Sequence, residues 1–329
     1  MLKTRADEQI EIEKYDDALA SGRKAVELAP QSGLAWSVLA IAMTFHPDTT
    51  WDDTVAAANR SIELDEASAA RAYCALGLLD WWNGYFDDAE EELREAIRLE
   101  PAFFQAHDVL GSVLSEAGRG EEAIAELREA VRLAPNRFSA KFDLAAVLAD
   151  SNYIDEATRV NMESLELART DSDRADVYNN AAYNHVWSDR PFEAVAAAQE
   201  GIRLDPEDPV VNESLGALLS LYGDPELAVP YLRAALAEEY PLVSAQPTWA
   251  YNLAIRGRTD EARAELKACG LDLIESWANV DALHIAGLAY HELGQPIVTT
   301  RIFRRALERW PAHPWSDEWQ AYVDERSGG

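Results

Sequence analysis

The chain has 329 residues, 48% of them hydrophobic, and a formal net charge of −30 from 59 acidic and 29 basic residues. This apolar content excludes global disorder, and the negative charge argues against general nucleic-acid binding, because attraction to phosphate needs a positive surface. Since the first fourteen residues are mostly charged or polar and no apolar run of about 18 residues occurs, we expect no signal peptide, no membrane insertion and a cytoplasmic protein.

One helix-turn-helix pattern recurs along the sequence with a period near 34 residues. It divides the chain into nine units of approximately 1–32, 33–68, 69–103, 104–137, 138–174, 175–208, 209–242, 243–276 and 277–312, followed by a capping helix at 314–326. A period of this length with two helices in each unit indicates a solenoid, in which each unit packs on its neighbours.

Unit one is predicted as a complete helical pair, and unit two departs from the pattern at its turn. Unit one is predicted to have a polar helix ending near Ile12, a turn at Tyr15 and a second helix over 16–28. In unit two, the stretch from His46 to Trp51 adds two residues to the turn, which we interpret as a surface insertion, with a functional loop as the alternative. A spacer at 170–173 is expected before unit six.

Prolines punctuate the later units. Second helices are expected to begin at Pro191, Pro225 and Pro296, where a missing N–H costs nothing. Pro230 is expected to kink or unravel the second helix of unit seven. In unit eight, Pro247 should shorten the first helix and Gly270 should end the second. Near the C-terminus, three aromatic residues at i, i+4 and i+7 predict a cap, namely Trp315, Trp319 and Tyr322.

Small residues recur where the helices of each unit should touch. In the first helices they are Ala40, Gly77, Gly111, Ala145, Ala182, Gly216, Ala250 and Gly287. The first contact position of the second helices holds Ala18, Thr54, Ala89, Ala123, Ala157, Ala194, Ala228, Ala262 and Thr299. The next holds Ala25, Ser61, Ala96, Ala130, Ser164, Gly201, Ala235, Cys269 and Ala306. Small side chains at these positions let helix backbones approach closely.

The pattern of small residues resembles the tetratricopeptide repeat family over nearly the whole chain. In the two clearest units, the pattern includes Leu-Gly in the first helix, at Leu76-Gly77 and Leu110-Gly111, and a proline after the second helix, at Pro101 and Pro135. The resemblance implies an all-α, right-handed superhelix of the generic bacterial type, forming one solenoid domain over residues 1–329. It also implies that the first helices line a binding groove.

Carried over position by position, the family's groove residues include Phe45, Arg71, Trp81, Trp82, Asp108, Phe142, Asp176, Asn179, Tyr183, Trp187, Glu213 and Tyr251, and Glu292 in unit nine. This set is aromatic and acidic, which favours a basic or amphipathic peptide or helix as the partner. Arg71 is almost its only cation, which argues against the carboxylate clamp of chaperone-binding repeats. For Trp81, Trp82 and Trp187, packing between repeats stays the alternative to ligand contact.

Signals for catalysis, metals and cofactors are missing from the sequence. It contains no Gly-rich phosphate loop and no Gly-x-Ser-x-Gly elbow. Cys74 and Cys269 lie in different repeats, so no disulfide is expected. His284 and His291 are two helical turns apart, about 10 Å, which is too far for one ion. We therefore expect no enzyme, no metal and no cofactor.

The sequence as a whole predicts a non-catalytic scaffold for protein–protein interaction. Two alternatives stay open. The chain could be a regulatory or sensor arm of a larger multidomain signalling protein, or a self-assembling structural protein that forms homo-oligomers.

Overall fold

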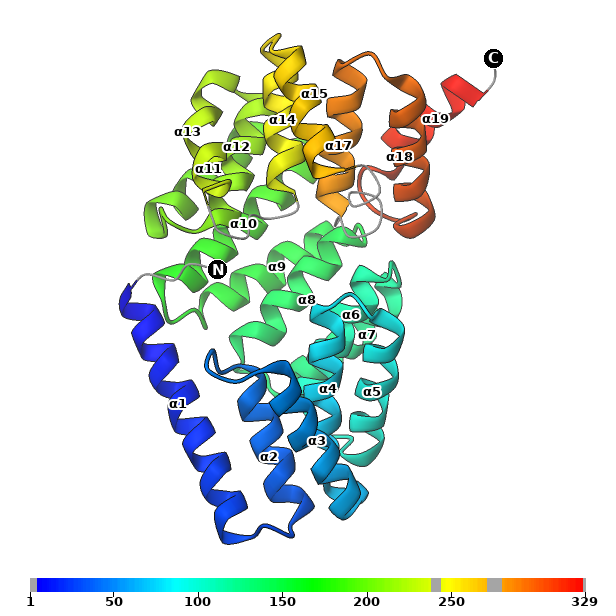
Figure 1. Ribbon diagram of the computed structural model, residues 1–329. Helices are drawn as coiled ribbons and strands as arrows, with labels where there is room; N and C mark the ends of the chain where they lie inside the picture. Colours follow the sequence, from blue (N-terminus) through cyan, green and yellow to red (C-terminus); the bar gives the residue numbers. More distant parts are fainter. Residues whose placement is uncertain (1–4, 238–243, 271–279, 328–329) are drawn as a thin grey trace. The chain divides into compact units, whose positions relative to one another are not determined.

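The computed structural model describes residues 5–237, 244–270 and 280–327, and these ranges contain helices, turns and loops without a strand. The helices are α1 (Arg5–Leu28), α2 (Gly33–Thr44), α3 (Trp51–Asp65), the 3-10 helix η1 (Glu66–Ser68), α4 (Ala70–Trp82), α5 (Phe86–Leu99), α6 (Phe104–Glu116), α7 (Gly120–Leu133), α8 (Phe138–Asp150), α9 (Ile154–Leu165), α10 (Asp171–Trp187), α11 (Pro191–Leu204), α12 (Pro209–Tyr222), α13 (Pro225–Ala235), α14 (Ala245–Ile255), α15 (Thr259–Cys269), α17 (Val280–Glu292), α18 (Pro296–Arg309) and α19 (Ser316–Ser327). The fold is therefore all-α, as predicted (Figure 1).

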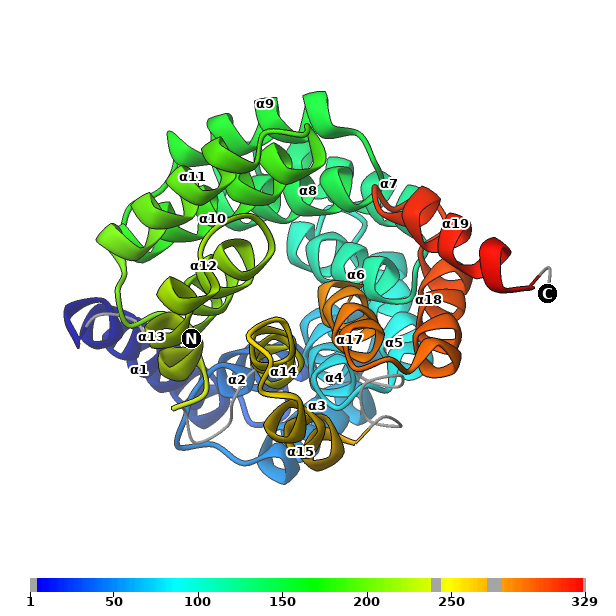
Figure 2. The same cartoon turned by 90° about the horizontal axis from the view of Figure 1, so that it is seen from above.

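Contacts between the helices define two compact groups, an N-terminal group over Arg5–Val147 and a C-terminal group over Leu148–Gly329. In each group, the first and second helices of a unit pack against each other, as α4 does with α5 and α12 with α13. Successive first helices form one layer and second helices the other (Figure 2). Each group is thus a stack of helical pairs, an α-solenoid; the single solenoid domain over 1–329 stays a prediction.

In four units, a large side chain of the second helix packs closely against a glycine of the first helix. A Cβ atom added to the glycine would come within 3.0 Å of that side chain, in the pairs Gly77–Leu93, Gly111–Leu127, Gly216–Leu232 and Gly287–Phe303. Contacts this short are not tolerated in a close-packed interior, so these units need glycine. Alanine occupies the position elsewhere and is buried, at Ala40, Ala145, Ala182 and Ala250.

In six units the turn between the two helices reverses the chain through one residue with positive φ. Glycine takes this place at Gly84, Gly118, Gly257 and Gly294, with φ between 68° and 78°. Asn152 and Asp189 take it in two other units, with φ of 66° and 55°. Asparagine and aspartate tolerate this conformation better than other non-glycine residues, which explains why the turn survives without glycine there.

Unit one differs from its prediction. α1 continues from Arg5 to Leu28 with no turn at Tyr15, so the unit has one long helix rather than a pair. The stretch around Tyr15 contains neither glycine nor proline, and nothing in it stops a helix. Without a partner helix, Ala18 is exposed and Ala25 only half-buried, whereas the other predicted contact positions of the second helices are buried.

Two expected irregularities have structural explanations. The predicted spacer at 170–173 begins α10, because the Thr170 side chain accepts a hydrogen bond from the Asp173 N–H (2.9 Å) while Asp173 Oδ2 accepts one from the Thr170 N–H (3.1 Å). The insertion after α2 is tied to α1, since buried His46 contacts Asp16 through Nε2 and Oδ1 at 2.8 Å. A structural role for this loop follows.

The proline and glycine predictions for units seven and eight have mixed outcomes. α13 continues through Pro230 to Ala235, so the helix does not unravel there. α14 begins at Ala245 and contains Pro247 in its first turn, where no helical N–H is lost. α15 ends at Cys269, followed by Gly270 with φ of 80°, as the sequence predicted.

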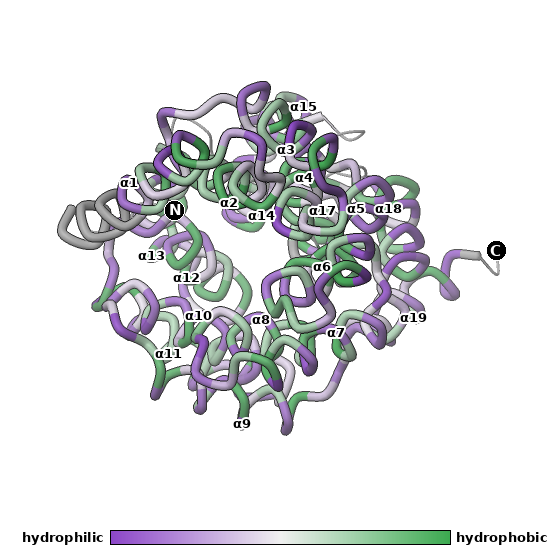
Figure 3. The backbone as a smooth tube through the Cα atoms, turned by 90° about the horizontal axis from the view of Figure 1, so that it is seen from below, coloured by the Kyte–Doolittle hydropathy of each residue, from purple (hydrophilic) through white to green (hydrophobic). Residues whose placement is uncertain are grey.

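A cluster of aromatic rings closes the C-terminal group. Trp319 of α19 is fully buried and its indole Nε1–H donates to His284 Nδ1 of α17 at 3.0 Å. Trp315 stacks on the His284 ring, with 3.9 Å between the ring centroids. α19 therefore acts as the predicted cap. Hydrophilic and hydrophobic stretches alternate along the helices (Figure 3), and no described helix is both long and apolar enough to cross a membrane.

Candidate peptide-binding surfaces

The predicted groove residues of the N-terminal group include an aromatic row at the ends of α2 and α4. Phe45 stacks on Tyr15 (centroids 6.1 Å apart) and meets the Trp82 ring edge-on at 5.9 Å. Half of the Trp82 surface is exposed, whereas its neighbour Trp81 is half-buried. This row offers Trp82 as an apolar contact for a partner.

The other predicted residues of this group are engaged within the protein. Arg71 pairs with Glu100 (Nη1 to Oε2, 2.9 Å) and lies over the Phe103 ring. Phe142 stacks on Phe138 of the same helix at 5.5 Å. An arginine already held by a carboxylate and a ring is poorly placed to bind another anion.

Asp108 is buried rather than presented on the surface. Its Oδ2 accepts a hydrogen bond from the Ser139 hydroxyl at 3.1 Å, and Oδ1 has no partner among the residues described. Burial raises the pKa of Asp108 to about 6, against the opposing effects of Ser139 and Arg137. The groove is consequently less acidic here than the sequence suggested.

In the C-terminal group, α10 carries four predicted residues, Asp176, Asn179, Tyr183 and Trp187. Tyr183 packs on Trp187 with 5.7 Å between centroids, and its hydroxyl lies 3.4 Å from Ser214 Oγ of α12. Trp187 also meets the Trp315 ring edge-on at 6.2 Å, so it packs partly against the cap segment. Asp176 is half-buried.

Several buried polar atoms of α10 have no hydrogen-bond partner within the described ranges, namely Asn179 Oδ1, Asn180 Nδ2, Asn184 Oδ1 and Trp187 Nε1. Leaving a buried polar atom unpaired costs about 1–3 kcal/mol.

A small apolar cavity lies between α10, α12, α17 and the cap segment. Tyr183, Glu213, Tyr222, Ile285 and Trp315 are among its walls. About 10 Å³ of it is open to the centre of a water molecule, which is room for one water and not for a metabolite. The cavity is therefore too small to bind a metabolite.

Glu213 is a buried carboxyl in that wall. Its Oε1 accepts a hydrogen bond from the Thr248 hydroxyl at 2.6 Å. Burial raises the pKa of Glu213, opposed by its hydrogen bonds to Thr248 and Ser244. The side chain is thus held by α14 and contributes polarity at the base of the surface rather than an exposed charge.

Beside the cavity lies an aromatic–acidic patch formed by Tyr222, Tyr251, Glu292 and Glu318. Tyr222 is 42% exposed and Tyr251 half-buried. Burial, then the Glu292 carboxylate and the nearby Tyr222 and Glu318, raise the pKa of Tyr251 to about 12. Of the four, Tyr251 and Glu292 lie at predicted groove positions. Tyr222 is the last residue of α12, and Glu318 lies on the cap helix α19. Neither place corresponds to a groove position of the repeat pattern, so neither residue was predicted from the sequence.

The described residues hold no group of three or more His, Cys, Asp or Glu side chains suited to a metal ion. His284 is committed to Trp319, while exposed His291 contacts the Tyr322 hydroxyl at 3.1 Å. Cys74 and Cys269 are free and buried, and burial raises the pKa of the Cys74 thiol to about 12. An unreactive, packed thiol follows from this environment.

The helical pairs stack on one another, and small residues in the first helices allow close contact with the second helices. These features define an all-α helical-repeat protein. Residues 70–103 and 104–137, which are α4–α5 and α6–α7, match the family model described as Tetratricopeptide repeat. No curated protein matches the chain. Tetratricopeptide repeats generally serve as non-catalytic interaction scaffolds.

Several solved structures have similar folds. YrrB, described as a tetratricopeptide repeat protein with an unusual peptide-binding site, is 22% identical, with a TM-score of 0.45 over 59% of this chain and 97% of that one. PilF of Pseudomonas aeruginosa is 20% identical (TM-score 0.46; 67% and 96% covered). MamA of Desulfovibrio magneticus RS-1 is also 20% identical (TM-score 0.42; 52% and 97% covered).

Proposed function

We propose that the protein is a non-catalytic interaction scaffold whose first-helix layer binds a peptide or helix with basic and apolar side chains. The observation that carries the proposal is the aromatic–acidic patch of the C-terminal group. The charges of Glu292 and Glu318 contribute to the raised pKa of Tyr251, and the charge of Glu318 contributes to the raised pKa of Tyr222. Lysine or arginine side chains bind well where rings and carboxylates occur together.

Neighbouring features would hold the rest of such a segment. Tyr222 connects the patch to the cavity, whose wall includes Tyr183, and Tyr183 packs on Trp187. Because the cavity holds only about one water, we expect the partner to lie along the surface with its side chains on the aromatic rings.

A defined peptide library tests this proposal. Peptides of about twelve residues that differ in charge and apolar content would be displayed and selected on the protein, and the affinities of selected and scrambled sequences would be measured by fluorescence anisotropy. We expect selection of peptides that combine arginine or lysine with apolar residues. Selection of acidic sequences, or of none, would contradict the proposal.

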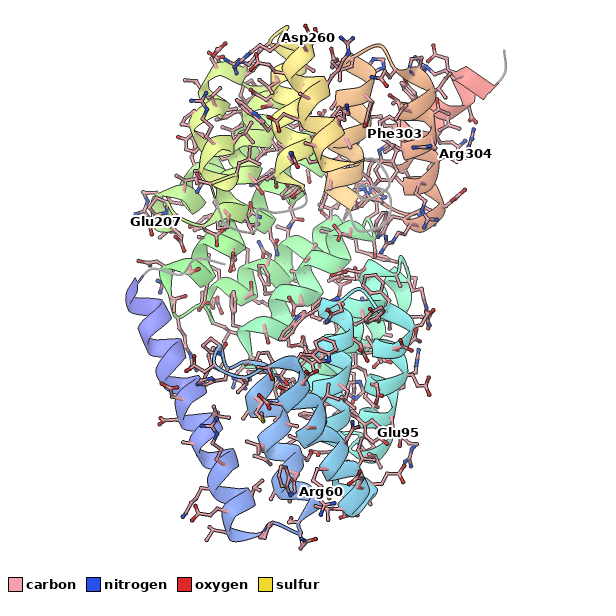
Figure 4. The ribbon with its side chains drawn as sticks, in the orientation of Figure 1. Arg60, Glu95, Glu207, Asp260, Phe303 and Arg304 are labelled. Carbon is pink, nitrogen blue, oxygen red and sulfur yellow. The ribbon has the colours of Figure 1, made fainter. Side chains whose placement is uncertain are left out.

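Isosteric variants locate the binding surface. Glu292→Gln/Glu318→Gln removes two charges from the patch. The affinity for basic peptides should fall by about tenfold, and the affinity for uncharged peptides should stay the same. Glu207→Gln/Asp260→Asn changes the charge equally at two exposed residues that are not part of the patch (both labelled in Figure 4) and should have little effect on peptide binding. Equal losses in both variants would indicate a general charge effect and no defined site.

A further inference from the structure

The outer face of α18 differs from that of every other described second helix. Acidic residues occupy the first turn of α3, α5, α7, α9, α11, α13 and α15. α18 has none there. Negative charge stabilises a helix N-terminus by complementing its dipole, so the last second helix forgoes a contribution that the others have. Some other requirement must explain its sequence.

That face carries a basic stripe, defined as Ile297, Arg301, Arg304 and Arg305. The opposite face of the helix is buried through Thr299, Ile302, Phe303 and Ala306. Ile297 is 85% exposed and the three arginines are exposed as well. Figure 4 shows Arg304 on the outer side of α18, away from α17. Arg305 pairs loosely with Glu308, with 3.6 Å between Nη1 and Oε2.

A hollow of about 840 Å³ on the outer face of the N-terminal group has the complementary charge. Six acidic residues line it, namely Glu66, Asp87, Glu90, Glu91, Glu92 and Glu95. Its two arginines are already engaged, Arg94 with Glu90 and Arg98 with Glu95, each at 2.8 Å. The hollow therefore keeps an excess of carboxylates, and Tyr73 contributes an aromatic ring. Glu95 is labelled on this face in Figure 4.

The carboxylates of the hollow repel one another. Burial, then Asp80, Glu91, Asp88 and Glu95, raise the pKa of Glu92 to about 7. A cationic side chain placed in the hollow would relieve this repulsion and lower that pKa.

We propose that the basic stripe of α18 docks into the acidic hollow of a second copy of this chain. The two surfaces match in charge, and the exposed isoleucine would meet the Tyr73 ring. Nucleic acid and anionic membranes also attract arginine, but the chain as a whole has a net charge of −30 and repels them. Each copy carries one stripe and one hollow, so the contact is heterologous and joins copies head to tail, into a ring or an open chain.

Charge reversal tests this contact directly. Sedimentation velocity of the full chain from about 1 to about 100 µM, at about 0.15 M salt to screen distant repulsion, should show mass increasing with concentration. Arg301→Glu/Arg304→Glu and, separately, Glu91→Arg/Glu92→Arg should each weaken this association at least about tenfold. An equimolar mixture of the two variants should associate again, because the reversed stripe of one matches the reversed hollow of the other.

A matched control is Arg203→Glu/Arg263→Glu, which makes the same charge change on α11 and α15 and should associate like the wild type. Circular dichroism checks that every variant keeps its helices. A wild-type protein that is monomeric throughout the series overturns the proposal. A mixture of the two charge-reversed variants that fails to associate also overturns it. A third contrary outcome is that the wild type binds DNA or anionic vesicles and the stripe variant loses this binding while its self-association is unchanged.

Discussion

At the scale of single residues, a glycine in the first helix of four units and the large side chain facing it decide how closely the two helices approach. A Cβ atom on Gly111 would lie 2.5 Å from Leu127 Cγ. Gly111→Ala should therefore destabilise the protein by about 1–3 kcal/mol, even though alanine favours helices more than glycine does. Urea unfolding followed by circular dichroism measures the loss.

The double variant Gly111→Ala/Leu127→Ala shows whether that contact is the cause. Leu127→Ala alone should cost about 2–5 kcal/mol, since Leu127 is fully buried. Adding Gly111→Ala to this background should then cost nothing further, because the methyl group enters space that the leucine left. Additive losses would show that the helix–helix contact is not responsible.

His284 makes the cap sensitive to acid. An indole N–H can only donate, so Nδ1 of His284 must be unprotonated to accept from Trp319. Burial and the neighbouring His313 lower the pKa of His284 to about 3, below its unfolded value of 6.5. Between these values only the unfolded chain binds the proton, so this contribution to stability is complete above about pH 6.5 and is lost as the pH falls toward 3.

His284→Gln isolates this effect, because glutamine can accept the indole hydrogen bond without titrating in this range. The unfolding free energy of the wild type should fall relative to the variant by up to about 1.4 kcal/mol per pH unit below pH 6.5. Above pH 7 the difference should be constant. Parallel curves down to pH 4 would contradict the assignment.

The sequence was enough to identify the small residues at the helix–helix contacts. It was not enough to predict which polar side chains of the groove are exposed. A glycine or alanine that recurs every 34 residues has few explanations besides a close helix contact. Burial of Glu213 and Asp108 depends on which neighbouring helix covers them, and sequence spacing does not determine this. Tyr222 and Glu318 come together only through the placement of the cap helix, so no pattern within one repeat could have indicated them.

At the scale of elements, α5 carries carboxylates that oppose its own folding. The pKa of Glu92 is raised to about 7, above the ordinary value of 4.5, so the folded state favours the protonated form. Stability from this group is present below about pH 4.5 and declines as the pH rises through 7. Glu92→Gln should therefore stabilise the protein by about 1 kcal/mol at pH 8, a figure reduced for solvent screening, and should be neutral at pH 4.

Thermal unfolding of both proteins at the two pH values measures this difference. Glu121→Gln, on the equivalent second helix α7, is the matched control and lies outside the hollow. A gain at pH 4 as large as at pH 8 would show that repulsion is not the source of the stabilisation.

Helix boundaries were predictable where glycine or proline marks them and uncertain elsewhere. The helix α15 ends just before Gly270, and α11 and α18 begin at Pro191 and Pro296. α1 was predicted as two helices by analogy with the other units, yet no residue near Tyr15 breaks a helix. The start of α10 was missed because the Thr170–Asp173 capping box was interpreted as a spacer.

At the scale of the whole molecule, a stack of helical pairs distributes its stability locally, because each unit contacts only its neighbours. Trp319→Ala removes the most deeply buried aromatic ring of the cap and should cost about 3–5 kcal/mol in the C-terminal group. Hydrogen exchange followed by mass spectrometry should show faster exchange in α17–α19 and unchanged exchange in α4–α7.

Equal acceleration in both helix sets would instead show that the chain unfolds as one cooperative unit. The control is Trp82→Ala, which removes a ring that is half exposed at the end of α4 and should leave α17–α19 unchanged. The all-α repeat architecture itself was predictable because one pattern occurs many times, so an error in one unit is corrected by the others. The binding surface occurs once and has no such redundancy.

The glycine–leucine contact has a consequence for how such chains recombine. Both members of each pair lie within one unit, so a duplicated or transplanted unit takes its own contact with it and needs no matching change in the recipient. Gene duplication can therefore lengthen the array in whole modules. The last unit is the exception, since Phe303 replaces leucine and faces rings of the cap, such as Trp319 at 6.4 Å, which makes it a poor donor for internal positions.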